Sequence, residues 1–282
     1  MRLRQLMLVF VAAFVPYLVA QDLDSAWRKY NRTDYDGALA DLSGRTGAPA
    51  LALRGRCQYM LDDFKAAVET FEQAIALEPG NSVSWNWLGK AFGRRAESAS
   101  AFAAPGLAVK ARKAFEKAVE LDPRNTEAMS DLLEYYLAAP GFLGGGVGKA
   151  QALAGRIAAA DPVEGHWARA QVARKQKRPD AAEQELRQAM ELAPREIGRV
   201  LDLARFLARQ QRYAESDELF RAAARLGPGH PKWLYARAET LIQSKRNLPE
   251  ARDLLRRYLA ADLTPDDPKR REAEALLREA GA

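Results

Sequence analysis

The chain has very little cysteine and histidine, which excludes several kinds of chemistry. Cys57 is the only cysteine among 282 residues, so no disulfide can form within one chain. We expect Cys57 to behave as a small, partly buried apolar residue. The two histidines, His166 and His230, are far apart in sequence, and neither has a partner at metal-ligand spacing. The sequence therefore predicts no metal site and no bound cofactor.

Recognisable catalytic motifs are also missing. The sequence contains no H-E-x-x-H, no C-x-x-C and no G-x-S-x-G. Gly148-Lys149 fails as part of a phosphate-binding loop, because Leu143 stands where the first glycine of G-x-x-x-x-G-K is needed. Ala150 follows where a Ser or Thr would bind the metal, and a helix is expected where a strand should precede the loop. We therefore predict that the protein is not an enzyme.

No charge of one sign dominates the chain. The formal net charge is +6, and the arginines are spread along the sequence and interleaved with Glu and Asp. A nucleic-acid-binding protein would concentrate its positive charge on one face. The pattern instead favours solvated helix surfaces of mixed charge, and it predicts no nucleic-acid partner.

A long apolar run occurs once, at residues 6–20. Arginines precede it and acidic residues follow it at once, an order typical of a secretory signal peptide cleaved after Ala20. The run is shorter than the roughly 20 apolar residues of a membrane-spanning helix. We expect residues 1–20 to be a signal peptide and the protein to be exported to the periplasm. Leu18 is larger than the cleavage site prefers, so an uncleaved inner-membrane anchor is the alternative.

What the sequence does contain is a repeated pattern of small and large apolar residues, each copy closed by a proline. These prolines are Pro79, Pro123, Pro162, Pro194 and Pro228. Their spacings fit a period of 34 residues if two units carry insertions of ten and five residues and one lacks two. Small residues let two helices approach closely, large ones fill the groove between them, and proline ends the helix.

The clearest copy has two halves. They read Trp85-x-x-Leu88-Gly89-x-x-Phe92 and Ala111-x-x-x-Phe115-x-x-Ala118, the second running into Leu121-Asp122-Pro123. The pattern resembles the tetratricopeptide repeat, a helix–turn–helix unit of 34 residues with W-x-x-L-G-x-x-Y, A-x-x-x-F and P landmarks. The resemblance covers nearly all of the chain after residue 20. It implies an all-α, right-handed superhelical solenoid with a C-terminal capping helix.

We expect residues 21–282 to form a single solenoid domain. Its units are placed at 22–47, 48–81, 82–125, 126–162, 163–196, 197–230 and 231–265, with a cap at 266–282. The charged final helix, Lys269 to Ala280, would cover the apolar face that the last unit exposes.

Two insertions interrupt the regular units. One lies within residues 93–107, where Ala103-Ala104-Pro105-Gly106 breaks helical continuity. The other covers residues 139–148, where five glycines in eight residues cannot continue a helix. We expect the second to be a structured loop, in which Phe142 and Leu143 fill an apolar gap. Alternatively it closes over a bound partner, because insertions in solenoids often lie on a binding face.

The candidate partner-binding residues come from helix geometry. On each first helix, residues one and five places after the first core position lie about 100–140° around the helix. In this family that side lines the concave groove. The set is Arg56, Asn86, Lys90, Ser130, Glu134, Trp167, Gln171, Arg205, Tyr235 and Glu239, together with Ala52 and Leu201. Trp167 and Tyr235 would be partly exposed anchors for a partner, or each would pack against a neighbouring helix.

Some members of the family hold a peptide's C-terminal carboxylate in a clamp of Lys, Asn and Arg. Arg56, Asn86 and Lys90 are similar in kind, but the following unit offers Ser130 and Glu134 where positive charge is needed. The clamp is therefore not assigned. Instead, Arg56 and Lys90 would attract an acidic stretch, and the later units would bind an aromatic or apolar segment.

These observations predict a non-catalytic scaffold that binds a protein or peptide in its concave groove. By analogy with exported relatives, the scaffold would support assembly of an envelope protein complex. A membrane-anchored subunit of an inner-membrane complex and an accessory domain of an enzyme are the alternatives. The sequence does not predict the oligomeric state.

Overall fold

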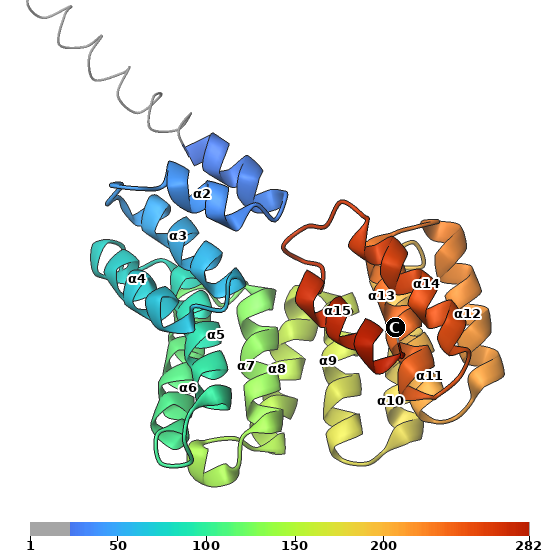
Figure 1. Cartoon of the computed structure of the whole chain (residues 1–282). Coiled ribbons are helices and arrows are strands. Elements are labelled where there is room, and N and C mark those ends of the chain that lie inside the picture. The colour runs from blue at the N-terminus through green and yellow to red at the C-terminus, as the bar shows by residue number, and fades with distance from the viewer. Residues whose placement is uncertain (1–22, 282) are drawn as a thin grey trace, which may run out of the picture.

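The computed structural model describes residues 23–281, which form an all-α solenoid (Figure 1). The signal-peptide prediction for residues 1–20 lies outside this part of the chain. Within the described part, no helix is both long enough and apolar enough to cross a membrane.

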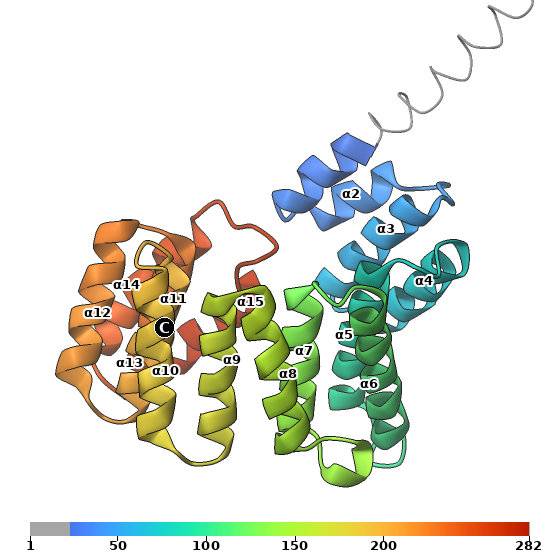
Figure 2. The ribbon, with the colours of Figure 1, turned by 180° about the vertical axis from the view of Figure 1, so that it is seen from behind.

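The solenoid is built from pairs of antiparallel helices. The first helices of the pairs are residues 23–31, α3 (Ala48–Met60), α5 (Ser82–Ser98), α7 (Thr126–Ala138), α9 (Pro162–Lys175), α11 (Ile197–Arg209) and α13 (Pro231–Gln243). The second helices are α2 (Tyr35–Asp41), α4 (Phe64–Leu77), α6 (Ala104–Leu121), α8 (Val147–Ala160), α10 (Pro179–Leu192), α12 (Tyr213–Leu226) and α14 (Leu248–Leu259). Each pair packs on the next, and α15 (Arg270–Glu279) follows the last pair (Figures 1 and 2).

Glycines on the first helices explain the close approach within a pair. A Cβ added at Gly55 would lie 2.8 Å from the ring of Phe71, and one at Gly89 would lie 2.5 Å from the ring of Phe115. Both phenylalanines are buried on the second helix of the same pair. The small residue that recurs on the first helix therefore leaves the space into which the large residue of the second helix packs.

The turns of the five uninterrupted pairs share one backbone conformation. Each contains a non-glycine residue with positive φ, at Thr33, Asp62, Lys177, Gln211 and Lys245. In each, the next amide donates to the carbonyl five residues earlier, as from Asp63 N to Gln58 O at 2.9 Å. This left-handed turn ends the first helix and costs roughly 1–2 kcal/mol when the residue is not glycine.

The first insertion lengthens two helices. α5 and α6 have 17 and 18 residues, whereas α3 and α4 have 13 and 14. Helical continuity breaks at residues 99–103, close to the predicted place, and α6 begins with Pro105 in its first turn. The sequence analysis expected an insertion that interrupts the unit. In the structure, most of the added residues instead form extra turns of α5 and α6, which extend past the neighbouring pairs.

The second insertion is a structured loop, as predicted. It contains the short helix η1 (Gly141–Leu143), and the amide of Gly146 donates to the carbonyl of Tyr136 at 2.8 Å. Gly145 has no room for a side chain, since a Cβ there would lie 1.9 Å from the carbonyl oxygen of Ala139. Phe142 does not fill an apolar gap, because it is 83% exposed; that expectation is wrong.

The C-terminal helix caps the last pair. α15 packs on α13 and α14, and its buried Ala273 belongs to the same apolar cluster as Tyr235 and Tyr258. The segment that leads to it is held by the Tyr258 hydroxyl, which donates to the carbonyl of Pro268.

The same C-terminal segment contacts the start of the solenoid. The Lys269 ammonium donates to a carboxylate oxygen of Asp62 at 2.5 Å and to the carbonyl of Tyr59 at 3.2 Å, and Arg271 also pairs with Asp62. Asp62 lies in the turn between α3 and α4. The segment before α15 therefore contacts the turn of the second helix pair, a contact that the sequence analysis did not predict.

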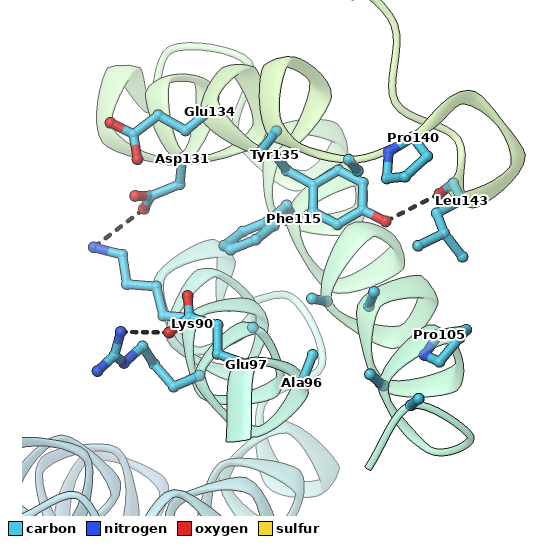
Figure 3. Close-up of a pocket in the computed structure, with 18 of the residues that line it drawn as sticks. Lys90, Ala96, Glu97, Pro105, Phe115, Asp131, Glu134, Tyr135, Pro140 and Leu143 are labelled. Atoms are coloured by element: carbon cyan, nitrogen blue, oxygen red, sulfur yellow. Dashed lines mark hydrogen bonds and ion pairs between the residues drawn. The ribbon is translucent and has the colours of Figure 1, made fainter. Parts of the chain in front are cut away.

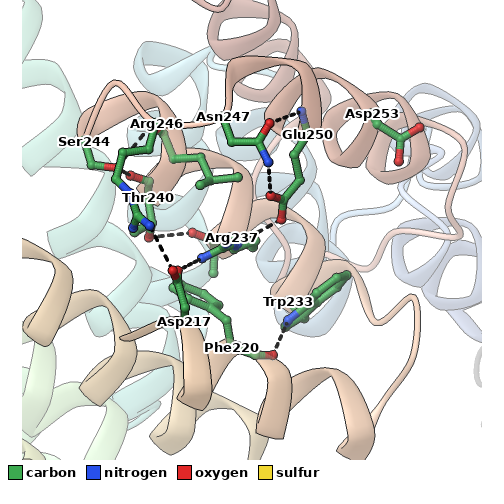
Figure 4. A network of polar contacts seen from close by, with 12 residues as sticks. Asp217, Phe220, Trp233, Arg237, Thr240, Ser244, Arg246, Asn247, Glu250 and Asp253 are labelled. Atoms are coloured by element: carbon green, nitrogen blue, oxygen red, sulfur yellow. Dashed lines mark hydrogen bonds and ion pairs between the residues drawn. The ribbon is translucent and has the colours of Figure 1, made fainter. Parts of the chain in front are cut away.

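A buried ion-pair network joins the last three regular helices. Asp217 of α12 accepts hydrogen bonds from Arg237 of α13 and from Arg246, the second at 2.9 Å (Figure 4). Arg237 also donates to Glu250 of α14 at 3.0 Å. The side chains of Asp217 and Arg237 are only 19% and 12% exposed, so the network is largely protected from solvent.

Candidate functional site

A cavity of about 680 Å³ lies between α5, α6 and α7. Each helix contributes one stripe of residues at helical spacing. The stripes are Lys90, Gly93, Arg94 and Glu97 on α5; Ala104, Ala108, Ala111 and Phe115 on α6; and Asp131, Glu134, Tyr135 and Ala138 on α7. Residues at i, i+3 or i+4, and i+7 share a helix face, so three faces converge on one space.

The cavity exists because long helices carry small side chains. The extra turns of α5 and α6 extend the walls, but Gly93, Ala96, Ala104 and Ala108 leave the space between them unfilled. The loop after α7 forms the remaining wall through Pro140 and Leu143, as Figure 3 shows. The Tyr135 hydroxyl donates to the Leu143 carbonyl at 3.0 Å and so fixes that wall. Leu143 thus has the apolar environment that was expected for it.

One edge of the cavity is charged. The Lys90 ammonium lies 2.7 Å from Glu127 and 3.1 Å from Asp131, and 4.9 Å from the ring centre of Trp87. Burial lowers the pKa of Lys90, but Asp131 and Glu127 raise it more, to about 12. Burial also raises the pKa of Asp131, against the opposing effect of Lys90 and of Asn86, which donates to it at 2.7 Å.

Glu134 is the carboxylate without a partner at this edge. Within residues 23–281 it makes no hydrogen bond and no ion pair, and its side chain is exposed. It lines the edge of the cavity, and Figure 3 shows its carboxylate beside Asp131, on the side away from Leu143. Partial burial of the carboxyl group and the negative charges of Asp131 and Glu164 raise the pKa of Glu134, and the charge of Lys90 opposes this only in part. Lys90 is already paired with two carboxylates, so the edge as a whole is acidic.

Two exposed phenylalanines flank the apolar end of the cavity. Phe102 is 99% exposed beside the lining residue Ala101, and Phe142 is 83% exposed beside Leu143. The α5–α6 turn and η1, which carry them, lie next to each other in Figures 1 and 2. Large apolar side chains this exposed are typical of an interaction surface when they adjoin an apolar hollow.

Models of the tetratricopeptide repeat match three segments of the chain, residues 48–81, 163–196 and 201–268. The chain is a tetratricopeptide repeat protein. Among curated proteins, none matches its sequence.

Solved structures support the fold of this tetratricopeptide repeat protein. A tetratricopeptide repeat protein from Parabacteroides merdae gives a TM-score of 0.60 at 11% identity, with coverage of 93% of this chain and 98% of that one. A thermophilic TPR protein from Thermus thermophilus gives 0.54 at 22% identity, with coverage of 70% and 97%. At these identities the likeness concerns the fold alone.

Several predicted groove residues of this tetratricopeptide repeat protein contact the next repeat. Asn86 of α5 bonds to Asp131 of α7, and Ser130 of α7 donates to Glu164 of α9 at 2.9 Å. Farther along, Arg205 of α11 lies 3.3 Å from Glu239 of α13. These pairs link successive first helices.

Three of the predicted groove residues are buried and not available to a partner: Asn86, Tyr235 and Leu201, the last only 2% exposed. Tyr235 is only 8% exposed and packs edge-to-face on Tyr258 with ring centres 5.3 Å apart, so the expectation of a partly exposed anchor is wrong. The capping segment covers it, and burial raises its pKa to about 12. Asn86 is 2% exposed and therefore positions Asp131 instead of facing a ligand.

The remaining groove residues have mixed environments. Trp167 is half-buried and contacts two apolar clusters, so it joins the two halves of the tetratricopeptide repeat array. Gln171 accepts a hydrogen bond from Arg174 at 2.8 Å. The Arg56 guanidinium lies over Trp27 and Trp87, 5.3 and 5.1 Å from their ring centres.

The expectation of an acidic partner near Arg56 and Lys90 stays a prediction, although the contacts of Lys90 disfavour it. Two carboxylates already contact Lys90, and two indole rings enclose Arg56. Sequence reasoning found Lys90 and Glu134 but missed the apolar wall, including Ala108, Phe115 and Tyr135. The i, i+4, i+7 spacing of alanines on the lengthened α6 was the available signal.

Proposed function

We propose that this protein-interaction scaffold binds a partner segment that places a large apolar side chain in the α5–α6–α7 cavity and a Lys or Arg beside Glu134. The observation that carries the proposal is the juxtaposition of an apolar space of about 680 Å³ with the exposed carboxylate of Glu134, which has no hydrogen-bond or ion-pair partner within residues 23–281. The chain acts without catalysis and presents a surface on which another protein is held.

The energetics fit such a segment. Burying one Leu, Met or Phe side chain contributes about 1.5–3 kcal/mol, and central apolar anchors usually dominate an interface. A cation beside the exposed Glu134 carboxylate would add about 0.2–1 kcal/mol, the usual contribution of a solvent-exposed ion pair. Phe102 and Phe142 would extend the apolar contact beyond the cavity.

Selection of random peptides on the immobilised protein tests this proposal. We expect enriched sequences to combine a large apolar residue with a nearby Lys or Arg. The same selection on a Glu134→Lys variant should lose the basic residue and retain the apolar one. Enrichment of acidic sequences by the unaltered protein, or identical enriched sequences from both proteins, would contradict the proposed specificity.

We also propose that the protein is exported and supports assembly of an envelope protein complex. The order of charges around the apolar run at residues 6–20 supports export, and the scaffold fold suits an assembly role. N-terminal sequencing of the protein purified from its native cells checks the first part. A mature chain that begins at Gln21 is expected, whereas a chain that retains residues 6–20 would favour the inner-membrane anchor.

A further inference from the structure

The segment that follows α14 reaches from the last helix pair to the second. Residues 263–269, which we call the strap, lie between α14 and α15, and Figures 1 and 2 show this segment extending toward α2 and α3. By contrast, no Cα atom of α2, α3 or α4 lies within 8 Å of a Cα atom of α11–α15. The strap and the first turn of α15 therefore link repeats whose helices do not otherwise approach each other.

The strap is fixed to the last pair at several points. The Tyr258 hydroxyl donates to the carbonyl of Pro268, and the Arg270 guanidinium donates to the carbonyl of Leu259. Leu263 is 4% exposed and belongs to the same apolar cluster as Tyr258. Because polar and apolar contacts both hold it there, the strap should move together with α14 and α15.

The contact of the strap region with the second pair is much narrower. The Lys269 ammonium donates to Asp62 and to the carbonyl of Tyr59, and it lies 5.4 Å from the ring centre of Tyr59 and 5.6 Å from that of Phe64. Arg271, in the first turn of α15, pairs with the same Asp62 carboxylate. In the described part of the chain, no other hydrogen bond or ion pair joins the strap or α15 to α3, α4 or the turn between them. One carboxylate therefore holds both cations.

The position of Lys269 is unfavourable for a charged group. Burial and the nearby charge of Arg271 lower the pKa of Lys269, and Asp62 opposes this only in part, so the pKa lies below its ordinary value. A lowered lysine pKa means that the folded environment disfavours the charged form. The ion pair with Asp62 therefore does not fully offset the loss of water around the ammonium, which makes the contact easy to break.

The strap also packs incompletely against the first pairs. A hollow of about 450 Å³ remains between them, lined by Tyr35 and Met60 on one side and by Leu263 and Asp267 on the other. Asp267 is 8% exposed, and its Oδ1 atom has no hydrogen-bond partner within the described residues. An unfilled hollow and a buried carboxylate oxygen without a partner both raise the free energy of the docked strap.

We infer that the strap is a releasable tether between the last and second pairs, which sets how widely the superhelix opens. Each pair in a solenoid contacts only its neighbours, so small rotations at successive joints add up along the array. A contact between distant pairs restrains their sum, and this restraint depends on the single carboxylate of Asp62. Release would widen the concave side and admit larger partners. The tether acts on the shape of the superhelix, whether or not the α5–α6–α7 cavity binds a partner.

The distance between two spin labels on the full chain, measured by pulsed electron spin resonance, tests this inference. Glu72→Cys on α4 and Arg256→Cys on α14 place the labels at exposed positions, and Cys57 is fully buried. The test variant is Asp62→Asn, because Asn keeps the shape of the side chain and tolerates the positive φ of 66° at this turn. We expect its distance distribution to broaden and to extend to values longer by several ångström than in the labelled protein that retains Asp62.

Asp63→Asn is the matched control. Asp63 is the next residue of the same turn, is exposed, and caps α4, a role that Asn also fills. It makes no contact with the strap, so its distance distribution should coincide with that of the unaltered protein. Lys269→Ala/Arg271→Ala removes the other side of the contact and should reproduce the effect of Asp62→Asn. An unchanged distribution in Asp62→Asn or in the double variant, or an equal change in Asp63→Asn, would overturn the inference.

Discussion

Tyr258→Ala is expected to lower the free energy of unfolding of the C-terminal repeat by about 4 kcal/mol, the range found when large buried aromatic side chains are truncated. Tyr258 is fully buried, packs on Tyr235, and donates its hydroxyl hydrogen to the carbonyl of Pro268. Its loss opens a cavity under the capping segment and frees the chain that positions Lys269. Hydrogen exchange of the amides in α13, α14 and α15 measures the effect locally, which suits a repeat protein whose units need not unfold together.

The matched control is Tyr258→Phe, which keeps the ring and removes only the hydroxyl. We expect it to cost about 1 kcal/mol, the usual contribution of one hydrogen bond. Equal loss of protection in the Ala and Phe variants would mean that the hydroxyl, and not the packing of the ring, holds the cap. No loss in either would contradict the described role of the capping segment.

Asp217→Asn should have the second largest effect on stability, lowering the free energy of unfolding by about 2–3 kcal/mol at neutral pH. The substitution keeps the shape of the side chain but leaves Arg237 and Arg246 without the charge that both contact. Hydrogen bonds to charged groups contribute about 1.5–3 kcal/mol, and the network is largely shielded from solvent. Thermal unfolding at pH 7 measures the difference between the variant and the unaltered protein.

The difference should shrink in acid. Burial raises the pKa of Asp217, but hydrogen bonds from Arg246 and Arg237 lower it more, so its pKa in the folded protein lies below the ordinary 3.8. A carboxyl with a lowered folded pKa stabilises the protein fully above its unfolded pKa and loses this effect as pH falls through the folded value. The two unfolding curves should therefore converge below about pH 4.

Asp253→Asn on α14 is the control for this network. Asp253 is exposed, and its partner Arg257 lies 3.8 Å away on the same helix, so its loss should change stability by less than about 0.5 kcal/mol (Figure 4). A similar loss in the Asp217 and Asp253 variants would show that the buried network contributes no more than a surface pair.

The repeat architecture could be predicted because its cause is local. Gly89 and Phe115 occupy fixed positions in the periodic pattern. In the structure, the ring of Phe115 fills the space beside Gly89, which has no side chain. The C-terminal cap was predictable for a similar reason, since a solenoid must cover its last apolar face. The length of α5 and α6 was less clear, because Pro105 reads as a break but is tolerated in the first turn of a helix.

The candidate site was only partly predictable, because its walls depend on contacts between distant segments. Helix geometry predicted that Lys90 and Glu134 face the concave side. It did not predict that the loop after α7 completes an apolar cavity. Tyr235 was expected to be exposed, and the capping segment buries it. The contact of Lys269 with Asp62 joins residues more than two hundred positions apart, and no local pattern signals it.

The central claim is that the α5–α6–α7 cavity receives an apolar side chain of a partner. The most direct measurement uses a peptide that was selected on the unaltered protein. Its dissociation constant is measured for the Ala108→Trp variant, in which an indole on α6 fills the cavity. Lys113→Trp adds the same indole to an exposed position of the same helix, outside the cavity lining. We predict at least about tenfold weaker binding by Ala108→Trp, equivalent to about 1.4 kcal/mol, and unchanged binding by Lys113→Trp. Equal affinity for all three proteins would contradict the claim.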